Sequence, residues 1–193
     1  LVGSEMCIRD RMNRLGMIVD LSHAGKQTCL DAIEVSNKPV AISHANPNFF
    51  HKSKRNIDTD ILQKLVKKNG FIGLSLYPYH LKNLGDCTIE DFCEMIKELV
   101  NLIGEDNIGI GSDLCLNWPD DVVMWMRNGK WTKNIDYGES KDKNPKWPKL
   151  PSWYKQPSDL NNLFYLMCEN NIPEKVSTKI IGQNWFNFMQ NQF

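Results

Sequence analysis

Short apolar runs of strand length alternate with longer helical patterns along most of the chain. The apolar runs cover residues 17–23, 40–44, 71–76 and 108–113. Between them, apolar side chains recur at helical spacing over residues 26–37, 58–68 and 88–103. Strands that alternate with helices are typical of βαβ units built around a parallel sheet. The pattern therefore predicts an α/β fold.

Two of the predicted helices carry start signals. Asp58 stands at the N-cap position of the second helix, and Thr88 stands at that of the third, with Asp91 in capping-box position. Further along, residues 160–167 and 173–188 return to a helical pattern. These closing helices are predicted to cover the sheet.

Three of the four predicted strands end on a side chain that can take part in catalysis. His23 ends the first strand, His44 ends the second and Asp113 ends the fourth. Neighbouring strands of a sheet lie about 4.8 Å apart, so side chains at matching carboxyl ends can converge. In a (β/α) barrel, packed side chains fill the interior and the chemistry lies at the C-terminal rim. The strand ends therefore predict a site at the top of such a barrel.

Composition places the chain among globular proteins and narrows its partners. The 193 residues are 41% hydrophobic and 24% charged. The 23 Lys and Arg residues balance 23 Asp and Glu residues, so the formal net charge is zero. No overall positive electrostatic potential therefore favours nucleic acid as a partner. No apolar run approaches the roughly 20 residues of a transmembrane helix. The six cysteines are scattered without a C-x-x-C pair, which indicates reduced thiols and slightly favours a cytoplasmic setting.

The two strand-end histidines are the strongest candidates for chemistry. A single histidine at a strand end is more often a hydrogen-bonded core residue than a metal ligand. His23 and His44, however, each follow a serine and lie 21 positions apart. For the pair, a shared metal site is therefore about as well supported as two structural roles. Zinc suits paired imidazoles, and a catalytic zinc keeps one position open for water.

Asp113 and Arg55 are the other candidates. Beside a metal-bound water, Asp113 could accept the proton as general base. Alternatively, it is a helix cap or a turn residue. Arg55 follows the second strand in a loop, and its guanidinium could clamp a substrate carboxylate through two parallel hydrogen bonds. A solvated basic loop is the alternative interpretation.

Structural roles are favoured for other polar and aromatic residues. His51 and His80 lack the strand-end position and are interpreted as loop residues. Asp20 falls on the opposite strand face from the histidine that follows it, so structural pairing is favoured over metal ligation. Tyr77 is interpreted as a packed aromatic residue. Residues 115–158 hold five of the six tryptophans and form either a lid over the site or a self-packed insertion.

The motifs GMIVDLSH, PVAISH, KRNID and NIGIGSD together resemble the membrane dipeptidase family, also called renal dipeptidase. Their order and intervals match, with 11 residues from His44 to Arg55 and 69 from His44 to Asp113. The closing IIGQNWFNFM is similar to the family's final helix. The resemblance covers residues 12–193. It implies the C-terminal half of a (β/α)8 TIM barrel of the metal-dependent, amidohydrolase-like type.

The resemblance also implies a chemistry for the candidate residues. Family members are binuclear zinc hydrolases that cleave small dipeptides. His23 and His44 would ligate the second zinc, and Arg55 would bind the terminal carboxylate of the dipeptide. Asp113 would handle the proton of the attacking water and contact the amino group of the substrate. A homodimer is compatible with this assignment.

Departures from the family pattern limit what this chain is expected to do. It contains no H-x-D pair, so the ligands of the first zinc and the glutamate that bridges both metals are missing. Two imidazoles fall short of the three protein ligands typical of catalytic zinc. We expect the isolated chain to bind zinc weakly and to lack dipeptidase activity. Residues 1–11 resemble translated adapter sequence rather than the family, so they are expected to be a non-native leader.

Two other functions stay open at this point. The barrel could serve a different amidohydrolase-type metal hydrolase that acts on a lactone or an amide. Alternatively, the half-barrel is a non-catalytic metal-binding module that pairs with a separate chain.

Overall fold

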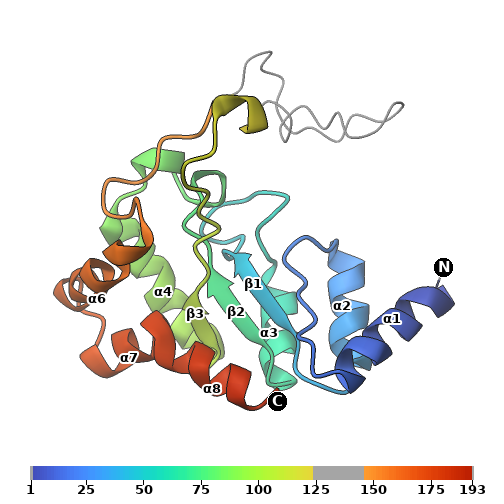
Figure 1. The fold of residues 1–193 in the computed structure, drawn as a ribbon. Helices are drawn as coiled ribbons and strands as arrows, with labels where there is room; N and C mark the ends of the chain where they lie inside the picture. Colours follow the sequence, from blue (N-terminus) through green and yellow to red (C-terminus); the bar gives the residue numbers. More distant parts are fainter. Residues whose placement is uncertain (1, 124–145, 193) are drawn as a thin grey trace.

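Three parallel strands lie at the centre of the fold, with helices packed around them (Figure 1). The computed structural model describes residues 2–123 and 146–192. The strands are β1 (Ala41–Ala45), β2 (Phe71–Leu74) and β3 (Ile108–Ile110). The first four helices are α1 (Val2–Arg14), α2 (Lys26–Val35), α3 (Thr59–Lys67) and α4 (Ile89–Ile103). The chain ends with α6 (Leu160–Glu169), α7 (Glu174–Thr178), a π-helical turn (Lys179–Gln183) and α8 (Asn184–Gln190).

The sheet has the strand order β1-β2-β3, and both pairs of neighbours are parallel. Helix α3 connects β1 to β2, and helix α4 connects β2 to β3. Each strand thus pairs with the next one after a helical crossover, which is the predicted βαβ arrangement. The α/β prediction and three of the four predicted strands are confirmed, although β2 and β3 are shorter than the apolar runs that predicted them.

The first predicted strand, over residues 17–23, is wrong as a regular strand. Its backbone pairs with β1 through an isolated parallel bridge between Asp20 and Ala41. Beyond this bridge, the Asp20 carboxylate accepts the backbone N–H groups of Ser22 and Ser43. A side chain thus replaces the ladder hydrogen bonds that would continue the strand. The segment is extended and lies beside β1, but regular pairing stops.

The two predicted helix caps differ in outcome. Thr88 precedes α4, and its hydroxyl accepts the N–H of Asp91 at 3.1 Å, as predicted. Asp58 precedes α3, but its side chain makes no cap hydrogen bond. Its carboxylate instead accepts hydrogen bonds from Lys26 at 2.8 Å and from Asn48 at 2.6 Å. The aspartate therefore links the start of α3 to α2 and to the loop after β1.

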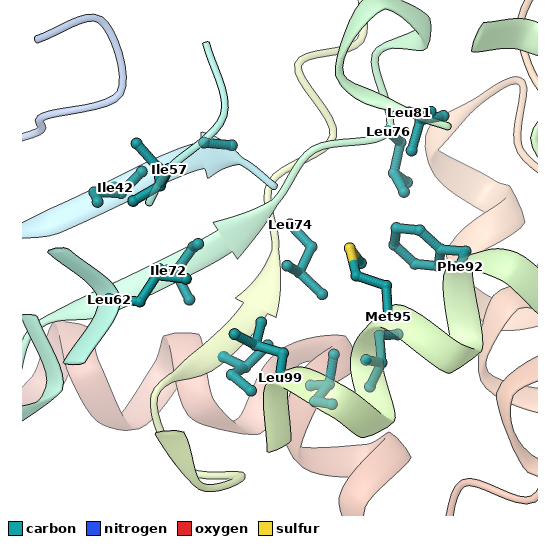
Figure 2. Close-up of a cluster of buried hydrophobic side chains, with 14 of the residues drawn as sticks. Ile42, Ile57, Leu62, Ile72, Leu74, Leu76, Leu81, Phe92, Met95 and Leu99 are labelled. Atoms are coloured by element: carbon teal, nitrogen blue, oxygen red, sulfur yellow. The ribbon is translucent and has the colours of Figure 1, made fainter. Parts of the chain in front are cut away.

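The hydrophobic core lies between the sheet and helices α3 and α4 (Figure 2). Ile42, Ile72 and Leu74 contribute from the strands, Leu62 from α3 and Leu99 from α4, and all five are 0% exposed. Each side chain of this kind stabilises the fold by about 1.5–3 kcal/mol when its apolar surface leaves water. The core thereby fixes the strands whose carboxyl ends carry the candidate site.

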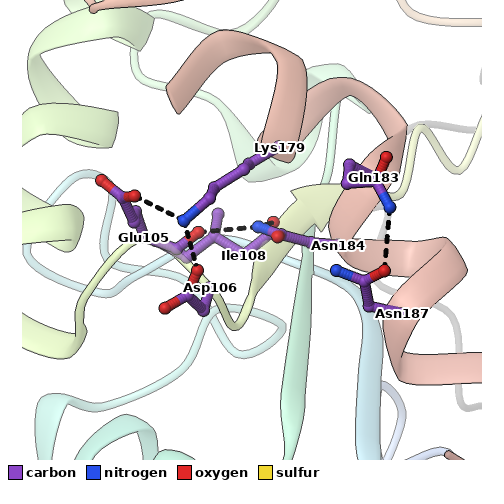
Figure 3. Close-up of polar contacts among 7 residues, drawn as sticks. All are labelled: Glu105, Asp106, Ile108, Lys179, Gln183, Asn184 and Asn187. Atoms are coloured by element: carbon purple, nitrogen blue, oxygen red, sulfur yellow. Dashed lines mark hydrogen bonds and ion pairs between the residues drawn. The ribbon is translucent and has the colours of Figure 1, made fainter. Parts of the chain in front are cut away.

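The C-terminal helices cover the outer edge of β3 (Figure 3). Asn184 donates from Nδ2 to the carbonyl oxygens of Glu105 and Ile108, at 2.7 and 2.8 Å. Trp185 donates from its indole nitrogen to the carbonyl oxygen of Ile110 at 2.8 Å. These donors satisfy carbonyl groups that an edge strand would otherwise leave unpaired. The prediction that the closing helices cover the sheet is confirmed.

The predicted insertion, residues 115–158, is described only at its two ends. Residues 124–145, with two of its tryptophans, lie outside the described residues. Trp147 donates from its indole nitrogen to the carbonyl oxygen of Trp118 at 2.7 Å. Trp153 is buried and donates to a backbone carbonyl at 2.8 Å. The ends of the segment are thus held together, and its role as a lid stays a prediction.

The N-terminal part of the chain is helical. The predicted leader, residues 1–11, overlaps α1, and its non-native origin stays a prediction. In the ranges 2–123 and 146–192, no helix is both long enough and apolar enough to cross a membrane.

Candidate metal centre

The side chains of His23 and His44 converge at the carboxyl end of β1. Their Nε2 atoms lie 3.0 Å apart, and the ring centroids lie 5.1 Å apart with the planes at 61°. A tetrahedral zinc with two imidazole nitrogens at 2.0–2.1 Å separates those nitrogens by about 3.3 Å. The observed separation is within a few tenths of an ångström of that value. The two side chains therefore fit two ligand positions of one zinc ion.

A β-bulge directs the ring of His44 toward this place. The register of β1 on β2 shifts between Ile42 and Ala45, so that Ser43 and His44 together face Gly73. Bulges redirect side chains and are common next to functional sites. Here the extra residue in β1 places both a serine hydroxyl and an imidazole on the side of the candidate site.

Glycines make room for the bulge. A Cβ atom at Gly73 would lie 2.0 Å from the carbonyl oxygen of Ser43, and one at Gly111 would lie 1.7 Å from the same atom. Neither position can carry a side chain unless the bulge moves. The backbone of β2 and of the turn after β3 thus shapes the site as directly as its side chains do.

A carboxylate holds the two Ser-His segments together. Asp20 accepts the N–H and the hydroxyl of Ser22 at 3.1 and 2.6 Å, and the N–H and the hydroxyl of Ser43 at 3.0 and 2.5 Å. Desolvation, the largest single influence, acts to raise the pKa of Asp20, but these hydrogen bonds together lower that pKa below its usual value. Asp20 therefore stays ionised and has the structural role that the sequence favours.

The guanidinium of Arg55 lies against the ring of His23. Its NH1 group donates to Nδ1 of His23, and its NH2 group lies 3.1 Å from Nε2. Partial burial lowers the pKa of His23, and the positive charge of Arg55 lowers that pKa further. His23 is therefore neutral near pH 7. Because its Nδ1 accepts from Arg55, its ring proton lies on Nε2 and points to Nε2 of His44, so a metal ion bound at Nε2 of His23 would replace that proton.

Buried asparagines anchor the loop that carries Arg55. Asn56 accepts the backbone N–H of Asn46 at 3.0 Å and donates to the carbonyl oxygens of His51 and His80, at 2.7 and 3.0 Å. His51 and His80 thus contribute backbone groups. His51 lies in a loop, as predicted, whereas His80 ends a short 3-10 helix, Pro78–His80, so its predicted loop position is wrong. The asparagine contacts were not predicted, because nothing in the sequence distinguishes these asparagines from exposed loop residues.

The side chain of His80 is buried beside the segment that follows β2. Its side chain is 3% exposed, and its Nδ1 lies 2.8 Å from the hydroxyl of Ser75. The ring of Tyr77 packs edge-on against it, with centroids 5.4 Å apart. Tyr77 therefore has the packing contact that the sequence favours.

Asp113 follows β3 in a left-handed backbone conformation, with φ at 52°. Its negative charge acts to raise the pKa of His23, against the effect of Arg55, so its carboxylate lies within electrostatic reach of His23. The preceding residue, Ser112, is hydrogen-bonded to the buried hydroxyl of Tyr154, which anchors this turn. The structure thus brings all four predicted site residues to one end of the sheet.

The histidine pair could fill only part of a metal site. Among the described residues, no group of three or more His, Cys, Asp or Glu side chains is arranged to hold a metal ion. A catalytic zinc typically has three protein ligands. The residues present fit two of those positions through convergent imidazole nitrogens.

Sequence comparison identifies the family to which this arrangement belongs. The sequence model of the membrane dipeptidase family, peptidase family M19, matches residues 3–120, which include both histidines, Arg55 and Asp113. The chain belongs to the membrane dipeptidase family. The resemblance carried by the strand-end motifs is thereby confirmed. The matched range begins inside the predicted leader.

The chain spans only part of the length of the relatives and solved structures that it matches here. A dipeptidase of Schizosaccharomyces pombe, itself uncharacterized, is 35% identical over 104 residues, which are 53% of this chain and 25% of the relative. An amidohydrolase structure from Pseudomonas aeruginosa is 31% identical, with a TM-score of 0.84 over 96% of this chain and 55% of that one. The chain thus spans about half of that barrel enzyme and a quarter of the yeast relative.

A second solved structure has the same fold at lower identity. A metallopeptidase from Rhodobacter sphaeroides, liganded with a phosphinate mimic of the dipeptide L-Ala-D-Ala, is 20% identical. It gives a TM-score of 0.75 over 97% of this chain and 46% of that one. The predicted fold class, half of an amidohydrolase-like barrel of the TIM type, is confirmed.

Proposed function

We propose that this chain carries half of the active site of a zinc-dependent dipeptidase. The observation that supports this most strongly is the convergence of the Nε2 atoms of His23 and His44 at 3.0 Å. Paired neutral imidazoles are ligands that zinc prefers. When bound, zinc polarises the scissile carbonyl and lowers the pKa of water. His23 and His44 hold one of the two zinc ions of the complete site.

Arg55 binds the substrate in this proposal. Its planar guanidinium matches a carboxylate through two parallel hydrogen bonds, so it receives the terminal carboxylate of the dipeptide. Its position against His23 supports this role, because the carboxylate would then lie next to the metal ligands.

Asp113 handles the proton in this proposal. A carboxylate beside the attacking water accepts its proton as general base and also pairs with the amino group of the dipeptide. Its position after β3, within electrostatic reach of His23, supports both roles. The left-handed backbone turn at Asp113, beside the hydrogen bond of Ser112 with the buried Tyr154, supports a defined position for this carboxylate.

The zinc assignment is tested by metal analysis of the folded chain after dialysis against zinc. Wild-type protein is expected to retain zinc, and the double variant His23→Ala/His44→Ala is expected to lose most of it. His51→Ala is the matched control, because His51 lies in the loop after β1 and contributes its backbone carbonyl to the asparagine contacts. Equal zinc content in wild type and double variant would refute the ligand assignment.

The 193-residue chain by itself is expected to be inactive on dipeptides. Its described residues supply two imidazoles where a catalytic zinc typically has three protein ligands. The measurement is hydrolysis of an unblocked dipeptide by the zinc-loaded chain. Turnover at a rate comparable with that of full-length family members would show that the site is complete without further residues.

A further inference from the structure

We propose that Asp20 and Ser43 are positioning residues that fix the tautomer of His44. They keep the ring proton on Nδ1, so that Nε2 presents a free lone pair on the side of His23. The consequence for zinc rests on the proposed function. The tautomer itself follows from hydrogen bonds within this chain.

The argument begins at Asp20, which can only accept hydrogen bonds while it is ionised. Its lowered pKa keeps it ionised at neutral pH. The hydroxyl oxygen of Ser43 lies 2.5 Å from Oδ2 of this carboxylate. Ser43 must be the donor in that hydrogen bond. Because a hydroxyl has one proton, the proton of Ser43 is committed to Asp20.

The ring of His44 contacts the same hydroxyl. The Oγ atom of Ser43 lies 2.8 Å from Nδ1 of His44. Since the hydroxyl proton is directed to Asp20, Oγ accepts here and Nδ1 donates. A neutral imidazole carries one N–H group, so Nε2 of His44 is unprotonated. That nitrogen faces Nε2 of His23 at 3.0 Å.

Ser22 supports the same arrangement from the neighbouring segment. Its hydroxyl donates to Asp20 at 2.6 Å and accepts the backbone N–H of His44 at 3.1 Å. The two hydroxyl groups lie 3.1 Å apart, but each has a shorter contact with the carboxylate of Asp20. Asp20 therefore fixes the backbone of His44 through Ser22 and the ring of His44 through Ser43. This gives the repeated Ser-His dipeptide a physical reason.

The tautomer is measured by nitrogen-15 NMR of the metal-free chain, from long-range proton–nitrogen correlations of the imidazole rings. The pH is kept above the usual histidine pKa, so that the rings are neutral. The variant His44→Gln identifies the signals of His44 by their loss. We expect a protonated Nδ1 and an unprotonated Nε2. A wild-type ring with its proton on Nε2 would overturn the proposal, whatever the variants do.

Three serine variants separate positioning from a general structural role. Ser43→Ala removes the acceptor of the Nδ1 proton, so the Nε2-protonated form is expected to gain population. Ser43→Thr keeps the hydroxyl and is expected to restore the wild-type tautomer. Ser22→Ala is the matched control, because it removes the other hydroxyl on the same carboxylate and leaves the Nδ1 contact in place. An unchanged ring in folded Ser43→Ala would also overturn the proposal.

Zinc affinity provides the second readout, measured by competition with a chromophoric chelator. Ser43→Ala is expected to bind zinc roughly 10- to 100-fold more weakly, the usual effect of losing a partner of a metal-ligating histidine. Ser43→Thr is expected to bind close to wild type. Unchanged affinity in Ser43→Ala would overturn the positioning role. If zinc binding persists in His23→Ala/His44→Ala, the proposed zinc site fails, whereas the tautomer assignment stands on the NMR result.

Discussion

At the scale of single residues, the candidate site depends on groups that do not themselves face the metal position. Asp20 joins the two Ser-His segments through four hydrogen bonds, and the carbonyl of Ser43 fits over Gly73 in β2 and Gly111 just after β3. His23 and His44 could be predicted because each ends an apolar run. The contacts of Asp20 could not be predicted, because they depend on the bulge in β1, whose position no periodic pattern reveals.

The lowered pKa of Asp20 predicts a pH dependence of stability. The contribution of its carboxylate to the free energy of unfolding is fully present above its unfolded pKa near 3.8 and is lost as the pH falls through the lower folded pKa. Asp20→Asn is therefore expected to be less stable than wild type at neutral pH. The difference, measured by urea denaturation at a series of pH values, should shrink below that unfolded pKa. A difference that grows toward acid pH would contradict this.

Gly111→Ala tests the close fit at the bulge. The added methyl group would lie 1.7 Å from the Ser43 carbonyl oxygen, so β1 must shift, and we expect a loss of about 1–3 kcal/mol in the free energy of unfolding. Zinc binding should weaken with it, because the shift displaces Ser43 and His44. Gly182→Ala is the control, since a Cβ there meets nothing within 4 Å. Equal stability of both variants would mean that the bulge does not need its glycine neighbours.

At the scale of elements, apolar periodicity predicts the strands and helices that share the core. The strand prediction fails where a side chain takes the place of the backbone hydrogen bonds between strands. The runs that became β1, β2 and β3 pack against α3 and α4, so burial enforces their pattern. The run over residues 17–23 has a similar pattern, but its pairing with β1 gives way to the Asp20 carboxylate. Sequence pattern alone does not distinguish a paired strand from such an extended segment.

Asn184→Ala tests how the C-terminal helices hold the edge of β3. Asn184 is 2% exposed and supplies the hydrogen bonds to the carbonyls of Glu105 and Ile108. Its loss leaves a buried carbonyl without that donor, so the free energy of unfolding is expected to fall by about 1–3 kcal/mol. Asn187→Ala is the matched control, because Asn187 is exposed and pairs with the side chain of Gln183 (Figure 3). A loss of equal size in both variants would rule out the edge contact as the cause.

At the scale of the whole molecule, one core connects the strands, α3, α4 and the closing helices. The family's barrel could be predicted because its motifs keep both their order and their spacing along the chain. The way in which the closing helices satisfy the carbonyls of β3 could not be predicted. Hydrogen bonds from Asn184 and Trp185 leave no periodic pattern in the sequence. The chain matches about half of a solved barrel enzyme, and its site residues gather at one end of the strands.

Thiol reactivity tests whether this core unfolds as one unit. Cys29, Cys87 and Cys93 are buried, and burial raises the pKa of Cys87 and Cys93 to about 12, whereas Cys115 is exposed. An alkylating reagent is expected to modify Cys115 in the folded protein. The three buried thiols should react only at the urea concentration of global unfolding, as read by peptide mapping. Modification of Cys87 well before that midpoint would show that the core opens in parts.

The most direct test of the central claim is X-ray absorption spectroscopy of the zinc-loaded chain. The account predicts two imidazole nitrogens at about 2.0–2.1 Å from zinc, with the remaining positions taken by oxygen ligands. The imidazole signal should disappear in His23→Ala/His44→Ala. Zinc bound through sulfur at about 2.3 Å, or an imidazole signal that is unchanged in the double variant, would contradict it.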